Sequence, residues 1–266
     1  MNKKLVFIVF FIFCRNFFCI AQNPYQLSWK KEACIAATGV AVAFAGDHFD
    51  NAIKPLTLAD IAALNPDNLN RLDRSTAYNY STHAVTISNI AVGACIVGPG
   101  SLLLEKRVRS QLLTIGVMYA EAGMFAAFLP SIAKGTVQRT RPFVYNHNAP
   151  IEKKLEAEAR RSFFSGHTCV AFTSAVFTAS LFDAYFPQSN HRTLVWGGSL
   201  VAAGLVGAMR IKAGAHFPSD VLVGALVGSA IGYTIPRLHR IRNERLSIHI
   251  IANNSVGLLT LNYKFH

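Results

Sequence analysis

Five long stretches with almost no charge limit the folds open to this 266-residue chain more than any other feature. A helix needs about 20 apolar residues to cross a bilayer, with a range of about 17 to 25. Four stretches reach that range and the fifth is slightly short: residues 82–104, 112–133, 168–186, 193–209 and 221–236. They are rich in Gly, Ala and Ser, which let membrane helices approach closely. The sequence therefore predicts an all-α bundle that spans a membrane, although buried helices of a large soluble bundle share this composition.

The overall charge narrows the possible partners. Charged residues make up 15% of the chain, against about 25% in soluble domains, so intrinsic disorder is excluded. The net charge of +12 suits nucleic acid, anionic lipid or a phosphorylated substrate. Because the basic residues are scattered among apolar segments, no nucleic-acid partner is expected. The five cysteines include no CxxC pair, which argues against a zinc ribbon or a disulfide scaffold.

The first 21 residues have the pattern of a signal peptide. Lys3 and Lys4 precede an apolar run, and small residues lead to a predicted cleavage after Ala21. A retained anchor is the alternative. Either reading puts residue 22 outside the cytoplasm, and the five spans then put residues 134–167 and 210–220 outside as well. The expected location is the bacterial inner membrane, with the active site on its extracytoplasmic face.

Four regions are expected along the chain. After the signal peptide (1–21), an extracytoplasmic N-terminal segment (22–81) contains a fourteen-residue apolar stretch, residues 33–46, that is expected to form a short helix on the outer side. The catalytic bundle covers residues 82–236. A basic tail with a β-hairpin covers residues 237–266, because apolar residues alternate on both sides of an Asn-Asn-Ser turn.

The first cluster of candidate functional residues combines two cations. Lys134 and Arg141 are seven residues apart, two helical turns, so they share one face until Pro142 ends the helix. A lysine ammonium and an arginine guanidinium together suit phosphate oxygens. The competing interpretation is a pair of interfacial cations beside a helix end.

The second cluster precedes the third apolar stretch. Ser165 is a candidate N-cap, and Gly166 would let an anion approach the free backbone N–H groups of a helix start. His167 would sit where a proton is delivered to a leaving oxygen. A capping serine beside an interfacial histidine is the structural alternative.

The third cluster holds Arg210, His216 and Asp220. His216 and Asp220 are four residues apart, so a continuous helix would put them on one face. The carboxylate would then hold one imidazole nitrogen protonated and leave the other free as a nucleophile. A metal site is disfavoured here, since three nearby cations would repel a divalent ion.

Taken together, the three clusters resemble the type 2 phosphatidic acid phosphatase (PAP2) superfamily, whose motifs read KxxxxxxRP, PSGH and SRxxxxxHxxxD. Two positions depart from the motifs: Phe164 replaces a proline and Met209 replaces a serine. The resemblance implies a phosphate-binding set of Lys134, Arg141, Arg210, Ser165 and Gly166. It further implies that His216, aided by Asp220, forms a phosphohistidine, that His167 protonates the leaving group, and that no metal or cofactor takes part.

The expected function is that of a membrane lipid phosphatase acting on an anionic lipid, such as lipid A, phosphatidylglycerophosphate or undecaprenyl diphosphate. The layout is most similar to bacterial lipid A phosphatases. The alternatives are a soluble periplasmic acid phosphatase, a vanadium haloperoxidase of the same superfamily, and a catalytically silent lipid-binding protein. The oligomeric state stays open. Glu121, an acid in mid-span, is expected to contact a neighbouring helix.

Overall fold

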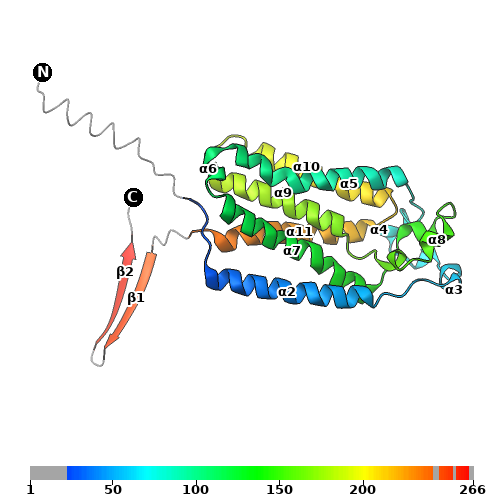
Figure 1. The fold of residues 1–266 in the computed structure, drawn as a ribbon, viewed down its shortest axis with the longest axis horizontal. Helices are drawn as coiled ribbons and strands as arrows, with labels where there is room; N and C mark the ends of the chain where they lie inside the picture. Colours follow the sequence, from blue (N-terminus) through cyan, green and yellow to red (C-terminus); the bar gives the residue numbers. More distant parts are fainter. Residues whose placement is uncertain (1–22, 242–245, 254–255, 264–266) are drawn as a thin grey trace, which may run out of the picture. The chain divides into compact units, whose positions relative to one another are not determined.

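The computed structural model describes residues 23–241, 246–253 and 256–263. Residues 25–240 form one compact unit, and the described residues 246–253 and 256–263 belong to a second. The first unit is a helical bundle (Figure 1). Its six long helices are α2 (Trp29–Asn51), α5 (Thr82–Val97), α7 (Leu112–Val137), α9 (Gly166–Tyr185), α10 (Arg192–Lys212) and α11 (Pro218–His239).

Short helices close the two ends of the bundle. One end carries α3 (Leu58–Ala62), η1 (Pro66–Asn68), α4 (Arg71–Arg74), η3 (Pro142–Tyr145), α8 (Ile151–Lys154) and η4 (Ala157–Arg160). The opposite end carries η2 (Gly98–Leu104) and α6 (Lys106–Arg109). Figure 1 shows α3, α4 and α8 together at one end and α6 at the other.

Five helical segments of the described chain are long and apolar enough to cross a membrane, which confirms the predicted spans in length and composition. They are Thr82–Leu104, Leu112–Val137, Gly166–Tyr185, Arg192–Lys212 and Pro218–His239. The third, α9, is 67% buried inside the protein, whereas the others are 17–33% buried. The helix α9 is therefore the centre of the bundle, and the other spans present most of their apolar surface outward.

Glycines bring α11 against α9 at van der Waals distance. Gly224, Gly228 and Gly232 are spaced by four residues and face the backbone of α9. A Cβ added to Gly228 would lie 2.2 Å from the carbonyl oxygen of Cys169, so no side chain fits there. Thr173 then donates a hydrogen bond to the carbonyl of Gly228 at 3.1 Å. This small-residue seam fixes where the start of α11 lies relative to the start of α9.

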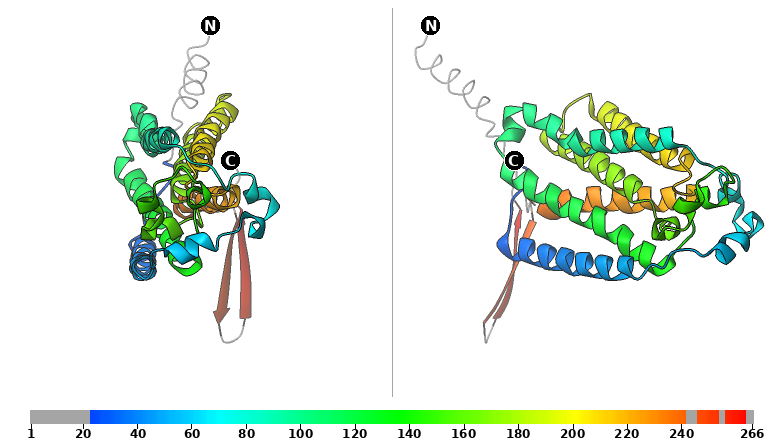
Figure 2. Two further views of the ribbon diagram at one scale, coloured as in Figure 1. Left: turned by 90° about the vertical axis from the view of Figure 1, so that its right-hand side faces the viewer. Right: turned by 45° about the vertical axis from the view of Figure 1, so that its right-hand side comes forward.

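The position of α2 contradicts an expectation. Residues 33–46 were expected to stay on the outer side with residues 134–167, but α2 has 23 residues and is about 35 Å long. Its start contacts the end of α11, where Lys31 donates to the carbonyl of Leu238 at 2.5 Å. Its end contacts the opposite end of the bundle, where Asp50 pairs with Arg161 at 2.9 Å. Both views of Figure 2 show α2 along the edge of the bundle. The start of α2 and residues 134–167 therefore lie at opposite ends.

The second unit contains two strands, β1 (Leu246–Asn253) and β2 (Val256–Tyr263), paired antiparallel with Leu246 opposite Tyr263. The predicted signal peptide, residues 1–21, lies outside the described residues. Its cleavage therefore stays a prediction.

Candidate active site

The three predicted clusters meet at one end of the bundle. Lys134 lies in the last turn of α7, Ser165 caps α9, Arg210 lies in the last turn of α10, and His216 precedes α11. The antiparallel order of the helices brings these chain positions to the same end. Arg141 lies between them, at the start of η3.

The cations Lys134, Arg141 and Arg210, here called the cation triad, lie close enough to His216 for their charges to act on its ring. Burial lowers the pKa of His216 well below its usual value, and the positive charges of Arg141, Arg210 and Lys134 lower it further. Lys134 also approaches the start of α9, since its Nζ lies 3.6 Å from where a Cβ of Gly166 would be. The glycine leaves that space open beside the ammonium group. The structure thus brings the sequence-predicted cations and the start of α9 together.

Arg141 and Arg210 are buried and incompletely paired. Each is 6% exposed. Arg141 forms an ion pair with Glu158 and donates to the carbonyl of Arg161 at 3.3 Å. Arg210 makes one long contact, to the Ser88 hydroxyl at 3.4 Å, and its Nε has no partner among the residues described. Buried guanidinium groups with free donors are suited to bind an anion.

The backbone at the start of α9 is only partly free. Ser165 caps the helix, its hydroxyl accepting from the N–H of Thr168 at 3.4 Å, as predicted. However, the N–H of Ser165 donates to the carbonyl of Asp220 at 3.1 Å. That donor is therefore already used, which corrects the expectation that it binds phosphate. Gly166 is the first residue of the helix, where backbone N–H groups have no acceptor within the helix.

No hydrogen bond joins His216 to Asp220 among the described residues, so the predicted hydrogen bond between the two is wrong. The Nδ1 atom of His216 lies 2.6 Å from the carbonyl oxygen of Ser162. Because a carbonyl oxygen only accepts, Nδ1 carries the proton and Nε2 keeps its lone pair in the neutral ring. The physical reason is the helix start: α11 begins at Pro218, so His216 lies outside it and is not on the same helical face as Asp220.

Asp220 instead forms hydrogen bonds and an ion pair with residues from three separate segments of the chain. It accepts from the N–H of Phe217 at 2.8 Å, which caps α11, and from the Ser162 hydroxyl at 2.6 Å. Its other oxygen pairs with Arg139 at 2.5 Å. Asp220 is therefore linked to His216 through Ser162, whose hydroxyl binds the carboxylate and whose carbonyl binds the imidazole.

His167 is the second imidazole at this end. Its Nε2 lies 3.0 Å from the amide oxygen of Asn89 on α5, and it donates its proton to that acceptor. The ring is partly exposed. His167 lies close enough to the cation triad to feel its charges, so it is a candidate for proton transfer at this end.

Arg139 and Asp73 were missed by the sequence analysis. Asp73 in α4 is fully buried, pairs with Arg139 at 2.7 Å and accepts from the Ser219 hydroxyl at 2.6 Å. Burial alone would raise the pKa of Asp73, but the bonds from Arg139 and Ser219 hold it below its usual value. Arg139 also lies over the ring of Phe217, 4.3 Å from its centre. No local pattern marks Asp73, because its partners lie 66 and 146 residues away.

These features define the class of protein: a helical bundle with five candidate membrane spans that brings three cations and two imidazoles together at one end. A sequence model of the PAP2 superfamily matches residues 111–244, half of the chain, so the chain belongs to the PAP2 superfamily. This match ends before β1, so the predicted hairpin stays a prediction.

Two known proteins are similar to this chain. The chain is similar to an undecaprenyl-diphosphatase of Sulfolobus acidocaldarius, with 30% identity over 133 residues, 50% of this chain and 57% of the relative. The matched region thus spans little more than half of that relative's length. The crystal structure of a transmembrane PAP2-type phosphatidylglycerolphosphate phosphatase from Bacillus subtilis matches with 22% identity and a TM-score of 0.42, covering 75% of this chain and 94% of that one.

Proposed function

We propose that this protein is a metal-independent phosphatase that hydrolyses a phosphate ester or diphosphate of an anionic membrane lipid. The observation that carries the proposal is the cation triad around His216, whose Nε2 keeps its lone pair because Nδ1 is held by the carbonyl of Ser162. Three cations neutralise the charge that a phosphoryl group spreads over its oxygens during transfer. Substrate binding would use Lys134, Arg141 and Arg210, with the N–H of Gly166.

The proposed reaction has two steps. The Nε2 atom of His216 attacks phosphorus, a P–N bond forms, and the P–O bond to the leaving group breaks. His167, in its imidazolium form, gives a proton to the leaving oxygen and becomes neutral. Water then attacks the phosphohistidine, passes a proton to His167 and releases inorganic phosphate, which restores both histidines. In this scheme Asp220 acts as a positioning residue through Ser162 and touches no reacting atom.

An apolar pocket supports a lipid as the substrate. A cavity of about 640 Å³ lies between α5, α9 and α10 and is lined by small and apolar side chains, among them Ala91, Cys95, Gly198 and Leu205. The same two outer helices carry Asn89 and Arg210 of the active site. An acyl or prenyl chain in this pocket would therefore extend from a headgroup held by the cation triad.

The location of the site is also a proposal. We place the cation triad on the extracytoplasmic face of a bacterial inner membrane, because the basic helix α6 at the opposite end favours the cytoplasmic side. The start of α2 would then face the cytoplasm. This arrangement excludes both interpretations of residues 1–21 given above, because a cleaved signal peptide and a spanning anchor each put residue 22 outside the cytoplasm. We propose that residues 1–21 are neither cleaved nor span the membrane.

A substrate panel tests the proposed activity. The full chain in detergent is expected to release phosphate from at least one of lipid A, phosphatidylglycerophosphate and undecaprenyl diphosphate, and His216→Ala is expected to abolish release. His191→Ala, at an exposed position away from the site, is the control. Full release by His216→Ala would contradict the mechanism.

A pair of glycine variants tests the lipid pocket. A Cβ added to Gly197 or Gly198 meets no atom within 4 Å, so both positions accept a side chain, but only Gly198 lines the pocket. Gly198→Leu is expected to slow release from a long-chain lipid while leaving a short-chain phosphate ester unaffected. Gly197→Leu is expected to change neither. Equal behaviour of the two variants on the lipid would contradict the pocket's role.

A further inference from the structure

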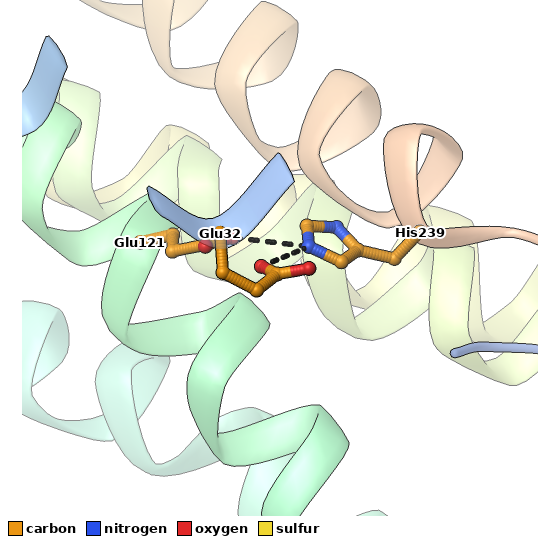
Figure 3. Close-up of side chains that lie close together, drawn as sticks. All are labelled: Glu32, Glu121 and His239. Atoms are coloured by element: carbon orange, nitrogen blue, oxygen red, sulfur yellow. Dashed lines mark hydrogen bonds and ion pairs between the residues drawn. The ribbon is translucent and has the colours of Figure 1, made fainter. Parts of the chain in front are cut away.

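A second cluster of ionisable side chains lies at the end of the bundle opposite the active site. Figure 3 shows Glu32 of α2, Glu121 of α7 and His239 of α11 converging on one point. One potential ligand atom from each residue lies within 4.8 Å of the other two. His239 is 19 residues beyond Asp220 on α11, which corresponds to about 28 Å. The cluster is therefore separate from the cation triad, and the proposed reaction does not use it.

The hydrogen bonds of His239 turn a lone pair toward the carboxylates. Its Nδ1 lies 2.8 Å from the carbonyl oxygen of Ile235, so Nδ1 carries a proton. In the neutral ring Nε2 is then a bare electron-pair donor. It lies 2.9 Å from Oε2 of Glu32 and 3.4 Å from Oε2 of Glu121. Three electron-pair donors facing one another require a cation between them, either a proton or a metal ion.

Burial strengthens the need for a cation between these three side chains, because little water reaches them. His239 is fully buried, and the side chain of Glu121 is 9% exposed. Within the described part of the chain, no hydrogen-bond donor reaches Oε2 of Glu121. Lys31 lies at the same end, but its ammonium group donates to the carbonyl of Leu238. A buried carboxylate beside a second, partly exposed one is costly without a compensating charge, so the cluster favours a doubly charged partner.

We propose that Glu32, Glu121 and His239 bind a divalent transition-metal ion, with Zn²⁺ as the preferred ion. Imidazole nitrogen and carboxylate oxygen are both zinc ligands, and three protein ligands leave a fourth position for water. Bonds of about 2.0–2.2 Å in a tetrahedral site put ligand atoms about 3.3–3.6 Å apart. The observed separation of 3.4 Å between Nε2 of His239 and Oε2 of Glu121 has that spacing, and the separation of 2.9 Å from Oε2 of Glu32 would widen by about half an ångström around an ion.

Two further contacts support the same site. A histidine that binds a metal commonly donates its second N–H to a backbone carbonyl, as His239 does to Ile235. Oε1 of Glu32 accepts a hydrogen bond from the N–H of Ser28 at 2.9 Å, which orients Oε2 toward the cluster. The side chain of Glu32 is 20% exposed and provides a path for the ion from solvent. A bound ion would fasten α2 to α7 and α11.

Metal titration of the full chain tests this proposal. The protein is purified in detergent without a histidine tag, stripped with a chelator, and titrated with ZnCl₂ by calorimetry, with bound zinc counted by elemental analysis. We expect one Zn²⁺ per chain and a rise in Tm when Zn²⁺ is added to the stripped protein. Glu121→Gln and Glu32→Gln are each expected to weaken binding at least about tenfold, because even indirect partners of a metal ligand contribute that much.

Matched controls separate this site from adventitious binding. Glu152→Gln and His191→Gln change the same residue types at exposed positions and are expected to bind Zn²⁺ as the unmodified chain does. If Glu121→Gln does not fold, Glu32→Gln alone tests the site, because Glu32 is partly exposed and its replacement disturbs the fold less. Equal zinc binding by the unmodified chain and the two cluster variants, or an unchanged Tm on adding Zn²⁺, would overturn the proposal and leave shared protons as the cation.

Discussion

His216 depends on a carboxylate that it does not touch. Asp220 accepts the hydroxyl proton of Ser162, and the carbonyl of Ser162 holds Nδ1 of His216. The residue types needed for phosphoryl transfer were recognisable from three spaced clusters. The contact between His216 and Asp220 was not, because the start of α11 falls between them. The ion pair between Asp73 and Arg139 could not be predicted from the sequence either, because only the fold brings the two residues together.

Removing the Ser162 hydroxyl is expected to slow turnover without weakening binding. Ser162→Ala leaves the carbonyl in place but breaks the link to Asp220, so the ring of His216 shifts. A displacement of a reacting group by about 1 Å costs about 100-fold in rate. We therefore expect kcat to fall roughly 10- to 100-fold with little change in KM. Steady-state kinetics on a lipid substrate measure both constants.

Ser110→Ala is the matched control for Ser162→Ala. Its hydroxyl donates to a backbone carbonyl, that of Arg107, at the other end of the bundle, whereas that of Ser162 donates to the Asp220 carboxylate. A fall in kcat shared by both variants, or a rise in KM for Ser162→Ala alone, would contradict the positioning role.

The depressed pKa of His216 predicts a pH dependence of stability. The folded protein keeps the ring neutral, whereas the unfolded chain binds a proton below the ordinary histidine pKa of about 6.5. The stability contributed by the neutral ring is thus full above about pH 6.5 and is lost as the pH falls toward the folded pKa. We expect Tm to drop between pH 7 and pH 5, and to drop less in His216→Gln. An equal drop in both proteins would contradict a buried neutral His216.

The helices position the site through one tightly packed pair. The seam between α9 and α11 aligns Ser165 with Asp220, whose backbone groups bond at 3.1 Å. The apolar stretches predicted the helices, and their order predicted which ends meet. The alignment of α11 with α9 was not predictable, because a row of glycines permits close packing but does not specify which helix packs against it. The length of α2 was also underestimated, since polar residues extend the helix beyond its apolar stretch.

A methyl group in the seam is expected to destabilise the bundle. A Cβ at Gly228 would clash with the backbone of Cys169, so Gly228→Ala forces the helices apart and costs about 1–3 kcal/mol. Gly204→Ala is the control, because a Cβ there meets no atom within 4 Å. Denaturant unfolding in detergent compares the two variants. A Gly228→Ala protein as stable as Gly204→Ala would contradict the packing of α9 on α11.

Across the whole molecule, the bundle has two chemically different ends. One end holds the cation triad and the loops around it, and the other holds α6, the start of α2 and the proposed metal site. Family membership follows from the sequence, whereas the placement of α2 along the bundle follows only from the structure.

Labelling from one side of the membrane tests this division. A single cysteine at exposed Glu152, in a chain with its own cysteines replaced, is expected to react with a membrane-impermeant maleimide in intact cells. A single cysteine at Trp29, 77% exposed at the start of α2, is expected to react only after permeabilisation. Reaction of both in intact cells would contradict the opposite placement of the two ends.

The central claim is that His216 receives the phosphoryl group between the three cations. The most direct measurement is mass spectrometry of the enzyme quenched at alkaline pH during turnover of a lipid substrate. The account predicts one phosphoryl group on the peptide that contains His216, and none in His216→Ala. Phosphate on a different residue, or turnover with no phosphorylated peptide, would contradict it.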